Sequence, residues 1–178
     1  MRGHCILSHG FESGPDATKV TALAEVAERL GWTHERPDYT AFDAQTNVTP
    51  LGDVTGRRQC LRKRIDSAVG HGPLVLAGSS LGSYISAMES VSSPVVGLFL
   101  MAPPIFRDFP DASVSLQAAE VPTWIVHPWD DELIPYQDVV NWAQPRRARL
   151  LLVNDSHRLS SHVQETAQVF ELFLRSLA

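Results

Sequence analysis

Short apolar runs alternate along this chain with stretches in which apolar residues recur every three or four positions. Apolar runs bounded by Gly, Pro or polar residues are typical of strands buried in a sheet, and the wider spacing is typical of helices with one buried face. The predicted strands lie at 5–8, 33–36, 74–77, 95–101, 124–126 and 150–153. The predicted helices cover 20–30, 61–69, 84–91 and 163–177, and a further short helix starts near Pro135. The polar segment 39–53 is expected to be an irregular loop.

This alternation predicts an α/β fold with a mostly parallel sheet of about six strands and helices on both faces. The length of 178 residues is ordinary for one domain, so we expect residues 1–178 to form a single domain. In parallel α/β sheets the functional groups gather at the carboxyl ends of the strands. An enzyme with this fold should therefore carry suitable polar residues directly after several strands.

The most informative of these strand ends carries a Gly-x-Ser-x-Gly motif. The motif is the segment 78–82, GSSLG, and it lies between the predicted strand 74–77 and the predicted helix 84–91. In this strand–turn–helix context the motif is typical of a nucleophile elbow, in which a strained turn exposes the central serine. The alternative is a Gly- and Ser-rich turn that only links two elements. We favour Ser80 as a nucleophile.

Three more predicted strands are followed by loops with candidate chemistry. The segment 8–15, SHGFESGP, follows the first strand, 127–135, HPWDDELIP, follows the strand at 124–126, and 154–157, NDSH, follows the last strand. Serine, then aspartate, then histidine, each after a separate strand, is the chain order of the catalytic triad in α/β-hydrolases.

On these segments the chain resembles the α/β-hydrolase superfamily over nearly its whole length. It is most similar to the small serine hydrolases without a lid. The segment 9–11, HGF, matches the family's His-Gly oxyanion loop, and 127–135 resembles its H-G-x-x-D-x-x-V-P pattern, with Pro128 at the usual glycine. The stretch between Met101 and Val121 is too short for an inserted cap domain, so we expect an open site.

The resemblance implies a role for each candidate residue. A serine hydroxyl needs an adjacent base, which is usually an imidazole oriented by a carboxylate. Ser80 would be the nucleophile, His157 the base and Asp131 the acid. The backbone N–H groups of Phe11 and Leu81 would form the oxyanion hole, which stabilises the charge that develops on the substrate oxygen.

Several neighbouring residues offer alternatives. Asp130 adjoins the favoured acid, and Asp155 lies so close to His157 that a role in the turn is favoured. His162 is interpreted as a surface residue near the start of the last helix. A metal site built from Asp155, His157 and His162, with or without His127, lacks a known ligand spacing, so we expect no metal and no cofactor.

The remaining candidates concern the walls of the site and its surroundings. Trp129 and Phe106 are the candidates for substrate contacts, and a packing role for Trp129 is the alternative. His9 and His127 are expected to shape their loops. The basic cluster on the predicted helix is interpreted as a solvated face. Its members are Arg57, Arg58, Arg62, Lys63 and Arg64.

Composition and charge narrow the range of partners. The net charge of −5 argues against nucleic acid and anionic membranes. Cys5 and Cys60 fit no metal or redox motif and are expected to be reduced thiols. The chain has no signal-peptide pattern and no apolar run of membrane-spanning length, so we expect a cytoplasmic protein.

The function expected from the sequence is that of a serine hydrolase that cleaves small carboxylic esters through an acyl-enzyme. A thioesterase or small-amide hydrolase with the same triad is an alternative, because the fold does not determine the substrate. A non-enzymatic binding module on the hydrolase scaffold is the alternative from another class. The expected partner is a small-molecule ester.

Overall fold

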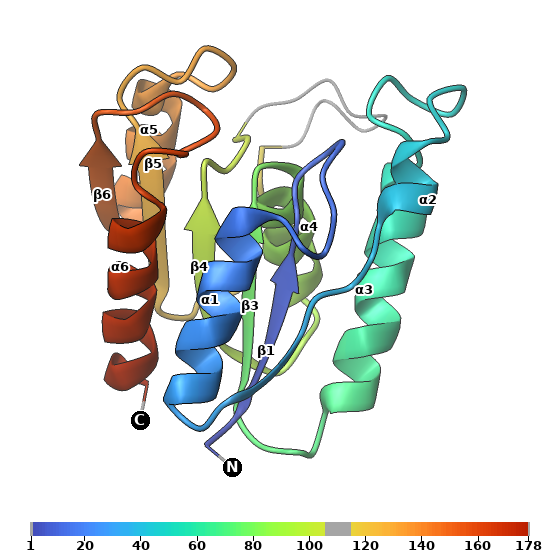
Figure 1. Ribbon diagram of the computed structural model, residues 1–178, viewed down its shortest axis with the longest axis vertical. Helices are drawn as coiled ribbons and strands as arrows, with labels where there is room; N and C mark the ends of the chain where they lie inside the picture. Colours follow the sequence, from blue (N-terminus) through green and yellow to red (C-terminus); the bar gives the residue numbers. More distant parts are fainter. Residues whose placement is uncertain (1, 106–114, 178) are drawn as a thin grey trace.

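The computed structural model describes residues 2–105 and 115–177 (Figure 1). Within these residues six strands form one sheet in the order β2-β1-β3-β4-β5-β6, and every neighbouring pair is parallel. The strands are β1 (His4–Ser8), β2 (Thr33–Glu35), β3 (Leu74–Ser79), β4 (Val95–Met101), β5 (Thr123–Pro128) and β6 (Arg149–Val153). The helices are α1 (Thr18–Arg29), α2 (Thr40–Asp43), α3 (Val54–Ala68), α4 (Leu81–Ser90), α5 (Tyr136–Arg146) and α6 (Val163–Ser176).

Helices cover both faces of the sheet. Helices α1 and α6 lie side by side on one face, and α3, α4 and α5 lie on the other (Figure 1). Successive strand residues point to opposite faces, so Val75 and Phe99 join the core under α1 and α6. Leu76 and Leu98 join the core under α3, α4 and α5. The strands are continuously apolar because both faces are covered.

The predicted fold class is confirmed, and two elements differ from the prediction. Helix α3 begins at Val54 instead of near Leu61, because the Asp53 side chain accepts a hydrogen bond from the Gly56 N–H and caps the helix. The segment 39–53, expected to be irregular, contains the short helix α2. Both differences lie in mostly polar sequence, where apolar residues are too few to mark a helix clearly.

The connection from β4 to β5, residues 102–122, contains no helix or strand in the part that the structure describes. The described residues of this connection thus form no cap domain. No helix among the described residues is long and apolar enough to cross a membrane.

Helix α4 packs unusually closely against the ends of β1 and β3. A Cβ atom on Gly82 would lie 2.1 Å from the carbonyl oxygen of Ser8, and one on Gly78 would lie 2.3 Å from the carbonyl group of Gly82. Real Cβ contacts are never this short, so both positions require glycine. This approach brings the first turn of α4 against the carboxyl ends of two strands.

We therefore expect Gly82→Ala to destabilise the protein by about 1–3 kcal/mol or more, because the atom that the new methyl group meets is backbone and cannot rotate away. Urea denaturation measures the free energy of unfolding. Gly14→Ala is the matched control, since its Cβ would lie 4.0 Å from the nearest atom, a Thr40 methyl, in ordinary contact. A Gly82→Ala protein as stable as the control would contradict the close approach.

Candidate active site

Ser80 occupies the turn between β3 and α4 with a backbone conformation that is rare for a residue with a side chain. Its φ is 51° and its ψ is −116°. The turn is held on both sides: the Ser80 N–H donates to the Met101 carbonyl at 2.8 Å, and the Ser83 hydroxyl lies 2.6 Å from the Gly78 carbonyl oxygen. Strain of this kind persists only where the surrounding structure holds it, and it clusters at functional sites.

His157 connects Ser80 to Asp131 through its two ring nitrogens. Nε2 lies 2.9 Å from Ser80 Oγ, and Nδ1 lies 2.8 Å from Asp131 Oδ2. A carboxylate can only accept, so Nδ1 carries a proton; in the neutral ring Nε2 is then the nitrogen that accepts from the Ser80 hydroxyl. The three residues follow β3, β5 and β6. The structure thus brings together the three residues that the sequence singled out.

The Asp131 side chain is fully buried and fully paired. Oδ1 accepts from the N–H groups of Leu133 and Ile134 at 2.9 and 2.8 Å, and Oδ2 accepts from His157. Burial acts to raise the pKa of Asp131, but the hydrogen bonds from His157 and the two amides outweigh it and hold the pKa below its usual range. The neighbouring Asp130 is exposed, so the geometry places Asp131 beside the histidine.

Two residues hold the loops on which Asp131 and His157 lie. His127 is fully buried, and its Nε2 donates to the Ile134 carbonyl at 3.0 Å, which closes the loop after β5. Burial lowers the pKa of His127, so its ring is neutral. Glu132 accepts the His157 backbone N–H at 3.0 Å and so joins the two loops. Nothing in the sequence pattern pointed to this bond, because it links residues 25 positions apart.

Asp155 and His162 form a separate pair beside the site. Asp155 accepts from the N–H groups of Ser156 and Ser161 and lies 2.9 Å from His162 Nδ1. Asp155 is thus a turn residue, as expected, and His162 faces it instead of Ser80. Among the described residues, no group of three or more His, Cys, Asp or Glu side chains could hold a metal ion.

The loop after β1 passes directly beside the turn that carries Ser80. A Cβ on Gly10 would lie 3.7 Å from Ser80 Cβ. The N–H groups of Phe11 and Leu81 donate no hydrogen bond to any described residue. For Leu81 the reason is its position at the start of α4, where amides have no partner within the helix. Within the described part of the chain, the N–H groups of both predicted oxyanion donors are therefore unpaired.

The structure contradicts the interpretation of Arg57 as part of a solvated face. Arg57 is 0% exposed, and its guanidinium donates to both carboxylate oxygens of Asp43 at 2.6 and 2.9 Å. It also donates to the backbone carbonyls of His9 at 3.1 Å and Gly10 at 3.0 Å. A buried charge needs this many partners to be tolerated.

A sequence signal for the burial of Arg57 was available. On α3 the arginine lies at helical spacing within the apolar stripe formed by Val54, Leu61, Ile65 and Ala68. Its neighbour Arg58 is partly exposed and binds the buried Glu89 with an Nε–Oε1 distance of 2.6 Å, and Arg62 also binds Glu89. The cluster therefore divides into buried, half-buried and exposed members.

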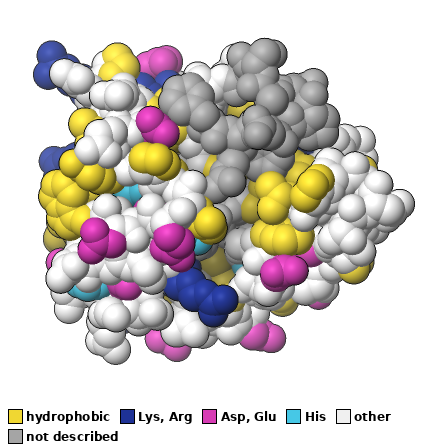
Figure 2. Space-filling view, turned by 90° about the horizontal axis from the view of Figure 1, so that it is seen from above, with side chains coloured by type: hydrophobic (Ala, Val, Ile, Leu, Met, Phe, Trp, Pro, Cys, Tyr) yellow, Lys and Arg dark blue, Asp and Glu magenta, His cyan; other side chains and the backbone are white. Residues whose placement is uncertain are grey.

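The two candidates for substrate contacts differ in what the structure describes. Trp129 is 46% exposed and packs its ring edge-on against Tyr136, with ring centroids 4.8 Å apart. Phe106 lies outside the described residues. Figure 2 looks down on the carboxyl ends of the strands, where apolar and acidic side chains and small patches of histidine reach the surface.

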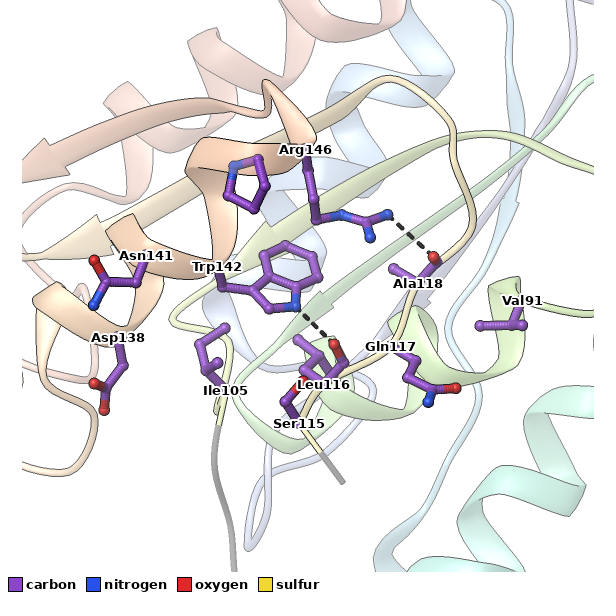
Figure 3. Close-up of a pocket in the computed structure, with 11 residues that line it drawn as sticks. Val91, Ile105, Ser115, Leu116, Gln117, Ala118, Asp138, Asn141, Trp142 and Arg146 are labelled. Carbon is purple, nitrogen blue, oxygen red and sulfur yellow. Dashed lines mark hydrogen bonds between the residues drawn. The ribbon is translucent and has the colours of Figure 1, made fainter. Parts of the chain in front are cut away.

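A cavity of about 490 Å³ lies apart from this site, between α5 and the segment 115–118 (Figure 3). The Trp142 indole N–H donates to the Leu116 carbonyl at 2.7 Å, and Arg146 donates to the Ala118 carbonyl at 3.1 Å. Ile105 also lines it, at the edge of the described residues. Ser80, Asp131 and His157 are absent from its described lining.

Comparison with solved structures identifies the family. A candidate hydrolase of the alpha/beta superfamily from Xanthomonas campestris is 60% identical, with a TM-score of 0.95 over 98% of this chain and 99% of that one. The protein therefore belongs to the alpha/beta hydrolase superfamily, and this relationship supports a hydrolase.

More distant structures share the fold. Est1E from Butyrivibrio proteoclasticus is 17% identical, with a TM-score of 0.75 over 99% of this chain and 88% of that one. An alpha/beta serine hydrolase without a lid from Xanthomonas campestris is 20% identical, with a TM-score of 0.72 over 97% and 81% of the two chains. No family model and no curated protein matches the chain.

The lowered pKa of Asp131 predicts a pH dependence of stability. An unfolded aspartate has a pKa of about 3.9, so the stability that this carboxylate contributes is fully present above that value and is lost as the pH falls through the lower folded pKa. We expect the difference in free energy of unfolding between the wild type and Asp131→Asn to shrink below about pH 4. Urea denaturation across pH 3–7 measures it.

Asp130→Asn is the matched control for this experiment. The Asp130 side chain is exposed and makes no hydrogen bond with the described residues, so its removal should leave the wild-type profile unchanged. An undiminished difference for Asp131→Asn at pH 3 would contradict the assigned environment of Asp131.

Proposed function

We propose that the protein is a serine hydrolase that cleaves small carboxylic esters through an acyl-enzyme intermediate. The observation that carries this proposal is the unbroken hydrogen-bonded chain from Ser80 through His157 to Asp131. A neutral imidazole with its free nitrogen on a serine hydroxyl, and its other nitrogen on a buried carboxylate, is the arrangement that activates serine for attack on a carbonyl.

In the first half-reaction, Ser80 Oγ attacks the ester carbonyl carbon and its proton passes to His157 Nε2. The resulting imidazolium is stabilised by the Asp131 carboxylate, which stays ionised. The tetrahedral intermediate then breaks its bond to the alkoxy oxygen. His157 Nε2 delivers the proton to that oxygen, so the alcohol leaves and the acyl group remains on Ser80.

In the second half-reaction, a water molecule replaces the alcohol. His157 Nε2 takes a proton from the water as its oxygen attacks the acyl carbon. The intermediate breaks its bond to Ser80 Oγ, and the proton on His157 returns to that oxygen. The products are the carboxylic acid and the regenerated serine, so no cofactor or redox partner is needed.

Each tetrahedral intermediate places a negative charge on the former carbonyl oxygen. The N–H groups of Phe11 and Leu81 are the donors that we assign to this charge, because both are unpaired among the described residues. Leu81 directly follows Ser80, and Phe11 directly follows Gly10, on which a Cβ would lie 3.7 Å from Ser80 Cβ. The dipole of α4 adds to the effect at Leu81. Losing one such donor typically reduces the rate by about 10²–10³.

Substrate contacts are proposed for Trp129, which lies two residues before Asp131. Its exposed ring, supported by Tyr136, offers an apolar wall beside the acid loop. Thioesters and small amides are accessible to the same machinery, and comparing matched ester, thioester and amide substrates on purified protein determines the preference.

The first prediction from this proposal concerns the nucleophile. Ser80→Ala should abolish labelling by a fluorophosphonate and reduce kcat by roughly 10⁴ or more. Ser79→Ala is the matched control, because Ser79 is the adjacent, buried serine at the end of β3 and should keep substantial labelling and turnover. If labelling is lost in Ser79→Ala and kept in Ser80→Ala, Ser79 and not Ser80 is the nucleophile of the motif. Wild-type protein that neither labels nor turns over any substrate would favour the binding module.

The second prediction concerns acyl chain length. A site without a cap domain has little apolar wall to bury a long acyl tail, and each buried methylene is worth about 0.8 kcal/mol of binding. We expect hydrolysis of soluble p-nitrophenyl acetate and butyrate, with kcat/KM flattening or falling beyond roughly six to eight acyl carbons. A steady rise toward long chains, or a jump above the critical micelle concentration, would show that the site is covered by another element.

A further inference from the structure

We propose that Arg57, held by Asp43, is a positioning residue that sets the direction of the Phe11 N–H in the oxyanion hole. Arg57 makes no contact with Ser80, Asp131 or His157 among its described hydrogen bonds, so it would act only through the loop after β1. The inference rests on the proposed hydrolase function and adds a residue from α3 to its machinery.

The planarity of the peptide bond transmits the effect. The Gly10 carbonyl and the Phe11 N–H belong to one planar, trans peptide group, so they point in opposite directions. Arg57 Nη2 donates to the Gly10 oxygen at 3.0 Å, and Arg57 Nη1 donates to the preceding carbonyl, that of His9, at 3.1 Å. Anchoring the Gly10 oxygen therefore fixes where the Phe11 N–H points.

His9 adds a second donor to the same oxygen. The Tyr39 N–H donates to His9 Nε2 at 3.0 Å, so the neutral ring carries its proton on Nδ1. That Nδ1–H donates to the Gly10 oxygen at 2.8 Å. Burial lowers the pKa of His9, and the nearby Arg57 charge acts in the same direction, so the ring stays neutral and the tautomer is maintained.

Asp43 holds the other side of Phe11. Its Oδ2 accepts the Glu12 N–H at 3.2 Å, and Glu12 has a φ of 55°, which is unfavourable for a residue with a side chain. The Arg57–Asp43 pair therefore binds the peptide groups before and after Phe11. The two side chains thus hold the peptide groups on both sides of Phe11, whose own N–H has no acceptor among the described residues.

The chemistry of this position requires arginine in particular. Its planar guanidinium group donates hydrogen bonds to Asp43 and to two backbone carbonyls at the same time. It also lies 4.6 Å from the centroid of the Tyr39 ring. Donation by a charged group also polarises the Gly10–Phe11 peptide, which makes its N–H a stronger donor. A buried ion pair contributes little net stability compared with apolar packing, so its use here is better explained by geometry.

The test compares an aryl butyrate with its thiono analogue, in which sulfur replaces the carbonyl oxygen. Sulfur is the larger and weaker hydrogen-bond acceptor, so an intact oxyanion hole favours the oxygen ester. Rates are normalised to the active fraction, which fluorophosphonate titration measures. A variant that only folds less well loses both activities equally and keeps the wild-type ratio.

Two variants are informative. Arg57→Lys keeps the positive charge but loses the several planar N–H donors of the guanidinium. The double variant Asp43→Asn with Arg57→Gln removes both charges and so leaves no unpaired charge. We expect kcat for the oxygen ester to fall by roughly 10–10², with KM within about threefold of the wild type, and the oxygen-to-sulfur ratio to fall in parallel. The matched control is Arg58→Lys, on the same helix, whose described ion pair is with Glu89 and not with the loop.

The ratio of oxygen-ester to thiono-ester activity decides whether Arg57 positions the Phe11 N–H. An unchanged ratio, with or without a loss of kcat, would overturn the role of Arg57, and so would the failure of both variants to fold. If only Arg57→Lys fails to fold, the double variant decides. Wild-type protein without turnover, or Ser80→Ala with full turnover, would instead refute the proposed function, and the inference would fall with it.

Discussion

The close approach of α4 to the ends of β1 and β3 is the constraint on which the site depends. Only glycine fits at positions 78 and 82, because any Cβ there would overlap backbone atoms. In the turn from strand to helix that α4 follows, Ser80 has a positive φ of 51°. The same packing places the unpaired first amide of α4 beside the serine and the loop after β1 next to both.

Buried charges around this turn are each stabilised by hydrogen bonds from or to specific partners. Asp131 is held by His157 and two backbone amides, and Arg57 is held by Asp43 and two backbone carbonyls. Each ion therefore orients the backbone of a loop as well as a side chain. Because the penalty for an unpaired buried ion is large, these loops have few alternative conformations, and the donors and acceptors are oriented before a substrate arrives.

In the part that the structure describes, the architecture also leaves the carboxyl ends of the strands without a second domain over them. No helix or strand lies between β4 and β5 in the described part of the chain, so the strand ends carry loops and not a second domain. Trp129 and Tyr136, both from the β5–α5 region, pack their rings against each other. The cavity beside Trp142 is lined by other residues and belongs to the packing of α5. Specificity in such a site must come from a few side chains on loops.

The sequence by itself determined the strands, the elbow at Ser80 and the placing of Asp131 and His157 after separate strands, because apolar periodicity and short turn motifs are local signals. Apart from the place of Arg57 in the apolar stripe of α3, it did not indicate which polar residues are buried. Asp43 and Arg57 are 14 positions apart, in a polar loop and a basic helix that both resemble solvated surface by composition. The Glu132 bond to His157 and the pairing of Asp155 with His162 were likewise decided by the tertiary structure. A charged residue is buried only where the folded chain supplies its partners, and no local pattern encodes where those partners will lie.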